Sequence, residues 1–149
     1  MYKKWPLLGV TLAELMIAMV IISILGTYAM VTYVRVYEKN RGVQAYTVLR
    51  MIRTAERLYY LDWNVYIALP VSCASNLVTE RYLQCPNSAA IKERGFNYVV
   101  TSAAPTNYVA TATREPASTS RYHGNTILLT VSCCPESPTW GGSWPWSPN

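Results

Sequence analysis

The chain has 149 residues, of which 51% are hydrophobic and only 14% are charged. This length allows one domain of ordinary size, or a small domain joined to one long element. The low charge excludes a solvated disordered chain and is atypical of a soluble enzyme. The net charge of +5 suits an anionic membrane surface or nucleic acid but requires neither.

The chain has few of the side chains that metal binding and catalysis use most. The chain has 8 acidic residues, among which Asp62 is the sole aspartate, and His123 is the single histidine. Carboxylate-rich metal cages and histidine-based catalysis need more such side chains than the chain offers. We therefore expect a protein that is not an enzyme, with no cofactor and no metal site.

A long apolar run near the N-terminus predicts a membrane-spanning helix over residues 10–34. Residues 15–34 carry no formal charge, and as a helix they would be about 30 Å long, the thickness of a bilayer's hydrocarbon core. Residues 1–9 form a short leader that contains Lys3 and Lys4. It differs from an ordinary signal peptide, because the apolar run is longer than about 15 residues and no Ala-x-Ala site follows it.

Helical periodicity continues beyond this run, so residues 35–62 are predicted to be an amphipathic half of the same helix. No proline interrupts residues 7–69, and one helix is expected from about residue 10 to about residue 61. Apolar side chains gather on one flank when the sequence is projected at about 100° per residue. That flank contains Ala45, Val48, Leu49, Ile52, Ala55, Tyr59 and Trp63.

Residues 63–149 read as a small globular part. An irregular loop is predicted over residues 67–94, followed by three strands at residues 96–101, 108–113 and 126–132. The tail from residue 135 onward, rich in Pro, Gly and Ser, is expected to be extended or irregular. The predicted fold class is α+β: a long N-terminal helix packed against a small antiparallel sheet.

Four cysteines lie in the second half of the chain and indicate disulfides formed in an oxidising compartment. They are Cys73, Cys85, Cys133 and Cys134. A bridge from Cys73 to Cys85 would close a loop of about 13 residues, worth roughly 3 kcal/mol. Two bridges joining this loop to the Cys133–Cys134 end are equally compatible with the sequence, so three connectivities remain open.

Glu14 stands at the start of the apolar run, where an ionised side chain calls for a partner. One interpretation is an interfacial glutamate whose carboxylate reaches water. The other is that cleavage after Gly9 frees an amino group on Val10, and that Glu14 of one subunit pairs with this amine on a neighbour. Such a desolvated pair would be sensitive to the loss of either member.

The residues around Glu14 carry a resemblance. The stretch Gly-Val-Thr-Leu-Ala-Glu-Leu-Met-Ile at residues 9–17, the apolar residues 21–26 and the Lys-containing leader resemble the N-terminus of a type IV prepilin. The resemblance extends to about residue 66. It covers residues 55–60 and 62–66, which are similar to the helix end of major pilins and type II secretion pseudopilins.

The resemblance implies particular roles. Gly9 would be the last leader residue recognised by the prepilin peptidase, which would also methylate the new terminus at Val10. Glu14 would register subunits in the filament. Leu12, with Leu15 and the apolar residues that follow it, would anchor the precursor in the inner membrane and later form the filament core.

We therefore expect the structural subunit of a type IV pilus, a helical homo-oligomer assembled by dedicated machinery. It would sit in the inner membrane as a precursor and then in an extracellular filament, with adhesion or motility as its purpose. One alternative is a type II secretion pseudopilin, which the scarcity of acidic calcium ligands disfavours. Another is a single-pass membrane-anchored binding protein that keeps its leader.

Two surface features have competing interpretations. Arg35, Lys39, Arg50, Arg53 and Arg57 form a narrow basic stripe on the predicted helix. The stripe could bind nucleic acid or another polyanion, although a solvated face or a contact with acidic neighbours is the more frequent use of such residues. Trp140, Trp144 and Trp146 could form an adhesive surface or pack against the sheet.

Overall fold

The computed structural model describes residues 9–88, 95–115, 121–122, 124–132 and 136–146. The chain divides into two compact units, Met1–Glu38 and Lys39–Asn149. Each is described by itself below.

One helix, α1, extends over Leu12–Trp63. It begins and ends two residues later than the sequence predicted, because the capping residues fix its ends. Thr11 stands immediately before it, and Asn64 follows it with a positive φ of 56°. The Asn64 N–H donates to the Tyr60 carbonyl at 2.7 Å. Asparagine tolerates the left-handed conformation well, and this single hydrogen bond is typical of a helix C-terminus.

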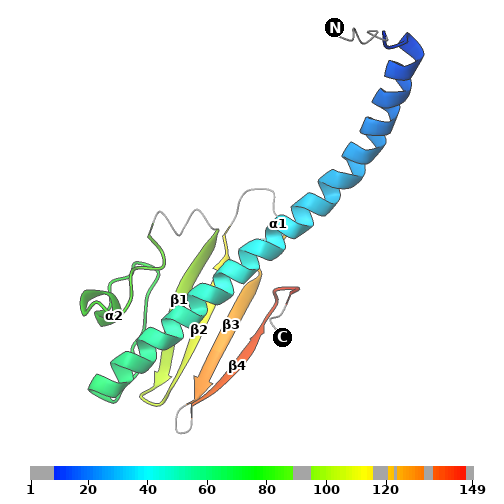
Figure 1. Ribbon diagram of the computed structural model, residues 1–149. Coiled ribbons are helices and arrows are strands. Elements are labelled where there is room, and N and C mark those ends of the chain that lie inside the picture. The colour runs from blue at the N-terminus through cyan, green and yellow to red at the C-terminus, as the bar shows by residue number, and fades with distance from the viewer. Residues whose placement is uncertain (1–8, 89–94, 116–120, 123, 133–135, 147–149) are drawn as a thin grey trace, which may run out of the picture. The chain divides into compact units, whose positions relative to one another are not determined.

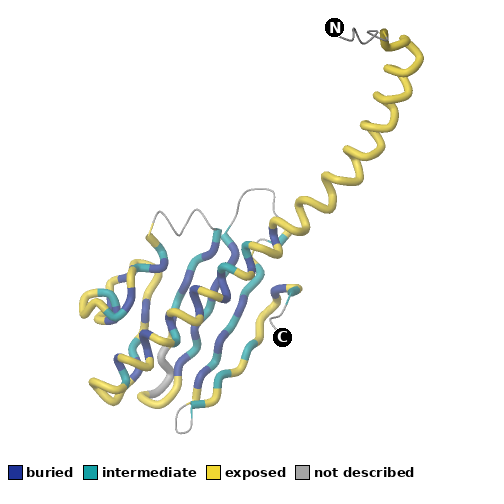
Figure 2. The backbone as a smooth tube through the Cα atoms, in the orientation of Figure 1, coloured by how far each residue is buried: buried dark blue, intermediate teal, exposed yellow. Residues whose placement is uncertain are grey.

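The first unit consists, among its described residues, of the start of α1 and the three residues before it. Residues 9–37 are all exposed, on every side of the helix (Figure 2). A helix that is apolar on all sides and unburied within its own chain needs another environment to cover it.

The second unit contains a four-stranded antiparallel sheet in the order β1-β2-β3-β4 (Figure 1). The strands are β1, Phe96–Ala104; β2, Asn107–Arg114; β3, Thr126–Ser132; and β4, Ser137–Gly142. The second half of α1 lies across one face of this sheet. The predicted α+β class, a long helix on a small antiparallel sheet, is confirmed.

The core lies between α1 and the sheet face that α1 covers. Six of the seven residues predicted to line the packed flank are buried, and each strand from β1 to β3 contributes every second side chain. Trp63 is the exception, with an exposed fraction of 58%, since it is the last residue of the helix. Tyr46 and Glu56 are buried as well, although neither belongs to the predicted flank.

The predicted meander of three strands is wrong in number, because β4 adds a fourth strand within the tail that the sequence predicts to be extended or irregular. Pro138 is tolerated because β4 is an edge strand, where one side of the backbone needs no ladder partner. Gly142 has a φ of 113°, and a Cβ there would stand 2.2 Å from the Thr126 carbonyl oxygen. Glycine therefore permits the closing pair of the β3–β4 ladder, Ile127 with Gly142.

The segment after α1 covers the outer edge of β1. Leu69 and Val100 form an isolated antiparallel bridge through two hydrogen bonds of 3.0 and 2.8 Å. The predicted irregular loop also contains a single helical turn, α2, at Asn76–Thr79, whose Leu77 side chain is fully buried. The segment meets the end of α1 where the Tyr82 hydroxyl donates to Asp62 at 2.6 Å.

Candidate functional site

The first half of α1 is long and apolar enough to cross a membrane, and none of its most apolar stretch is buried within the chain. Leu12 and Leu15, predicted to anchor the chain, are exposed with the rest of this half. The membrane-spanning prediction agrees with these properties of length and composition.

The N-terminus of α1 is closed by a reciprocal pair of side-chain bonds between Thr11 and Glu14. The Thr11 N–H and hydroxyl donate to Glu14 Oε2 at 2.9 and 2.8 Å, and the Glu14 N–H donates to Thr11 Oγ1 at 3.3 Å. This is a capping box, which satisfies backbone donors that an α-helix leaves unpaired at its start. The spacing Thr-x-x-Glu is its sequence signature, so this role of Glu14 could have been predicted.

The capping box gives the Glu14 carboxylate a partner within its own chain. Within the described residues its carboxylate has no basic partner, and both bonds from Thr11 end on Oε2. Oε1 therefore remains available to a donor outside the chain. Gly9 and Val10, the predicted processing residues, precede the helix and are exposed, while the leader residues 1–8 lie outside the described residues.

The predicted basic stripe is partly neutralised inside the chain. Arg53 Nε lies 2.7 Å from Glu136 Oε1, and Arg57 Nε lies 3.9 Å from Glu136 Oε2. The hydrogen bond to Glu136 raises the pKa of Arg53. Arg50 has no acidic partner within the described part of the chain, and it is exposed. The interpretation that the stripe meets acidic residues thus holds for two arginines, although the acid belongs to the same chain.

These arginines line a hollow of about 470 Å³ together with Thr54 and Trp140. Trp140 comes from β4, at the open edge of the sheet, and its ring packs edge-on against Tyr46 with centroids 5.2 Å apart. The hollow therefore combines three guanidinium groups with an indole that is only partly buried.

The other two tryptophans of the tail are packing residues. Trp144 is buried, and its ring centroid lies 5.2–5.6 Å from those of Phe96, Tyr122 and Trp146. Tyr46 donates its hydroxyl proton to the Trp146 carbonyl at 3.1 Å. The interpretation that the tail packs its rings against the sheet describes these residues, and Trp140 alone faces the basic hollow.

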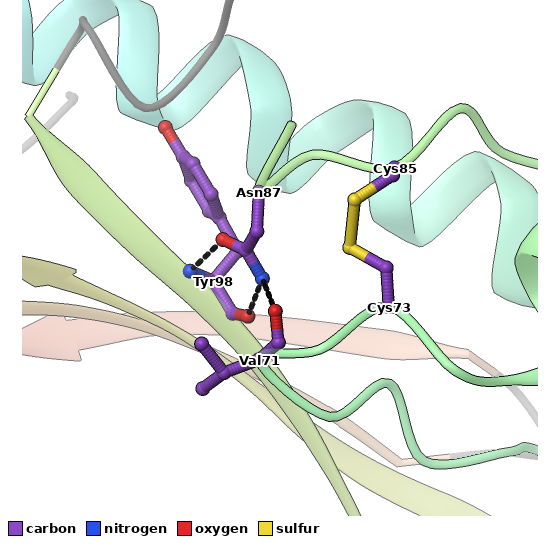
Figure 3. The surroundings of a disulfide bond; sticks show 5 residues. All are labelled: Val71, Cys73, Cys85, Asn87 and Tyr98. Atoms are coloured by element: carbon purple, nitrogen blue, oxygen red, sulfur yellow. Dashed lines mark hydrogen bonds between the residues drawn. A yellow bond between two sulfur atoms is a disulfide. The ribbon is translucent and has the colours of Figure 1, made fainter. Parts of the chain in front are cut away.

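A disulfide joins Cys73 and Cys85, one of the pairings that the sequence left open. Next to it, the Asn87 amide donates to the carbonyls of Val71 and Tyr98 at 3.0 and 2.8 Å, and its oxygen accepts from the Tyr98 N–H at 2.8 Å (Figure 3). The side chain thereby imitates a strand residue at the outer edge of β1. Cys133, Cys134 and His123 lie outside the described residues.

A buried carboxyl was not predicted. Glu56 is fully buried, and its Oε2 accepts a hydrogen bond from the Ile67 N–H at 3.2 Å. Oε1 has no hydrogen-bond partner among the described residues. Burial raises the pKa of Glu56 to about 8, so the group is mostly neutral at pH 7. The position of Glu56 between Ile52 and Tyr59 on the apolar flank is the sequence feature that could have predicted its burial.

No family model, curated protein or solved structure that was compared with this chain matches it.

Proposed function

We propose that this chain is the precursor of a structural filament subunit of the type IV pilin kind. The prepilin peptidase would cleave it after Gly9 and methylate the amine of Val10, and it would be held in the inner membrane before assembly into an extracellular filament. The role is structural and not enzymatic. Assembly machinery would move the apolar helices out of the bilayer, where they bury one another.

The observation that carries this proposal is that every residue from 9 to 37 is exposed, although the helix that begins at Leu12 is apolar over this stretch. Burying apolar surface contributes about 25 cal/mol per Å², so such a helix is stable either in lipid or among copies of itself. The second unit has its own core and disulfide. These properties suit a filament subunit in which the apolar helix packs against other copies and the second unit is exposed to solvent.

The chemistry of Glu14 gives the filament a registration device. Thr11 engages only Oε2, so Oε1 can accept from the Val10 amine of an adjacent subunit after cleavage. In an apolar bundle an unpaired charge is costly. Copies would therefore stop sliding where this pair forms.

A pair of variants separates the capping role from the registration role. Thr11→Val removes the hydroxyl of the capping box but keeps the carboxylate, whereas Glu14→Gln removes the charge and keeps a side chain that accepts hydrogen bonds. We expect Thr11→Val to form filaments in near-normal amounts and Glu14→Gln to form few, with equal amounts of both proteins in the membrane. Equal filament yields from the two variants, measured by electron microscopy of sheared preparations, would reject the registration role.

Mass spectrometry of the purified protein tests the processing step. We expect a mature chain that begins with methylated Val10. A chain that retains the leader would instead favour a single-pass membrane-anchored binding protein. Calcium bound to the mature protein would favour the pseudopilin alternative.

A further inference from the structure

The hollow beside β4 has properties that filament assembly does not use. Arg50 and Arg57 are exposed, and Arg50 has no acidic partner among the described residues. The remaining lining groups are Arg53, Thr54 and the partly buried ring of Trp140. A hollow with this lining attracts an anion that also offers a flat surface.

Glu136 shows which chemistry the arginines accept. Its two carboxylate oxygens face two different guanidinium groups, at 2.7 Å from Arg53 and 3.9 Å from Arg57. Guanidinium groups bind oxyanions of phosphate and carboxylate alike through paired N–H donors. Arg50 has no acidic partner among the described residues, so this third arginine can take a further oxyanion.

The spacing of the arginines selects an extended ligand. Arg50 and Arg57 are seven residues apart on α1, which places them on the same side of the helix and about 10 Å apart along its axis. At this spacing each guanidinium can hold a phosphate of its own, so a chain of regularly spaced phosphates engages both arginines at once.

The indole selects among extended anions. Proteins that bind single-stranded nucleic acid combine a basic groove along the phosphates with aromatic rings on which bases stack. Trp140 lines the hollow together with the three arginines, so both kinds of group are present here. A paired duplex keeps its bases stacked inside and offers no free base face to this ring.

We propose that the hollow lined by Arg50, Arg53, Arg57 and Trp140 binds single-stranded nucleic acid, with phosphates on Arg50 and Arg57 and a base on Trp140. Binding is electrostatic in the main and independent of sequence. This role is additional to filament assembly and does not depend on it.

The test measures binding of labelled oligo-dT and oligo-dA to the full-length protein in detergent by fluorescence anisotropy, over a series of salt concentrations. We expect saturable binding that weakens with salt. Arg50→Gln and Arg57→Gln should each reduce the slope of log affinity against log salt by about 0.7, the value for one phosphate contact on a single strand. Arg81→Gln is the matched control, because Arg81 is an exposed arginine on the disulfide loop, away from the hollow.

Two further variants make the test specific. Glu136→Gln removes the competing negative charge and should strengthen binding, an effect that a damaged fold would not produce. Trp140→Leu should weaken binding about fivefold or more through lost stacking, and Trp140→Phe should retain most of it. A urea unfolding curve for each variant identifies any loss of fold. If the Trp140 variants are unfolded, the Arg50, Arg57 and Glu136 variants still test the proposal.

Several results would overturn the proposal. One is the absence of saturable binding at low salt. Another is undiminished binding by Arg50→Gln and Arg57→Gln. A third is equal competition by duplex DNA, heparin or polyglutamate together with no effect of Trp140→Leu, which would indicate a general polyanion surface.

Discussion

Gly42 lies directly beneath the indole of Trp144, so that a Cβ at position 42 would stand 2.3 Å from Nε1 of that ring. In sequence, a glycine in the middle of a helix is only a weak point. The structure gives Gly42 a role: the missing side chain lets the ring reach the α1 backbone. Trp144 is in turn enclosed by Phe96, Tyr122 and Trp146, and these contacts limit how far its ring can move.

Gly42→Ala is therefore expected to destabilise the second unit, although alanine is intrinsically favoured in helices by about 1 kcal/mol. Overpacking a close contact of this kind costs about 1–3 kcal/mol. The measurement is urea unfolding of the full chain in detergent, followed by the near-ultraviolet circular dichroism of the aromatic cluster.

Gly26→Ala is the matched control for Gly42→Ala, since both glycines belong to α1 and nothing stands within 4 Å of a Cβ at position 26. It should not lower the unfolding midpoint, because no steric cost offsets the helix propensity of alanine. In the double variant Gly42→Ala, Trp144→Phe the smaller ring should recover part of the loss, giving a coupling between the two positions. Equal midpoints for Gly42→Ala and the wild type would contradict the steric explanation.

Glu56 predicts a pH dependence of stability. Its pKa is raised to about 8 in the folded chain, against about 4.3 for an unperturbed glutamate. Between these values the unfolded chain releases a proton that the folded chain keeps, so the free energy of unfolding falls as pH rises. The slope is at most about 1.4 kcal/mol per pH unit and ends near pH 8, where the folded chain also ionises.

The groups around Glu56 do not offset this effect. The phenols of Tyr66 and Tyr108, whose ring centroids are 4.8 Å apart, lie close to the carboxyl. Burial and the nearby Glu56 and Glu136 carboxyls raise the pKa of Tyr108, so it stays neutral across the range. Arg53, three residues before Glu56 on α1, is already engaged by Glu136.

Glu56→Gln should abolish the contribution of this group. The amide oxygen can still accept the Ile67 N–H, and no charge develops. We expect equal stability of variant and wild type near pH 5 and a growing advantage of the variant up to about pH 8. Subtracting the two curves cancels the other titrating groups. Glu80→Gln, at an exposed glutamate, should show a flat difference, and a flat difference for Glu56→Gln as well would show that the carboxyl is ionised in the fold.

The sequence predicted the fold class and the helix well, for identifiable reasons. The apolar period of α1 is long and uninterrupted, so a face such as Ala45, Leu49 and Ile52 is recognisable without tertiary information. β3 alternates strictly, and its predicted bounds are those observed. In both cases the local pattern and the tertiary packing impose the same periodicity.

Prediction was wrong where tertiary contacts decide. β4 has a strand conformation because β3 offers an unpaired edge, and its Pro138 and Gly142 are locally unfavourable to a strand. The hollow could not be predicted either, because it forms between segments that are far apart in sequence. Glu136 and Arg53, which pair there, are 83 residues apart. The capping box, by contrast, needs no tertiary contact. Its signature is already present in the sequence at Thr11 and Glu14, where Glu14 was interpreted only as an unpaired charge.

Asn87 is predicted to stabilise the outer edge of β1. Asn87→Ala removes three hydrogen bonds and leaves the Tyr98 N–H without its side-chain acceptor. The loss of one buried partner costs about 1–3 kcal/mol, so we expect a lower urea midpoint. Asn76→Ala, at an exposed asparagine in α2, should have little effect. If Asn87→Ala unfolds like the wild type, the amide contributes nothing to holding this edge.

The disulfide and Asn87 restrain the same segment, so their effects should not add. Cys73 and Cys85 are 12 residues apart in sequence, and opening a loop of this length costs roughly 3 kcal/mol in the chain-entropy model. Cys73→Ala, Cys85→Ala should thus lower stability more than Asn87→Ala. Without the disulfide, however, the Asn87 hydrogen bonds form only if the segment is ordered at an entropic cost, so they contribute less net stability. Asn87→Ala should therefore cost less in that background. A double-mutant cycle from urea midpoints measures this coupling. A coupling energy of zero would show that the disulfide and the amide hold independent parts of the segment.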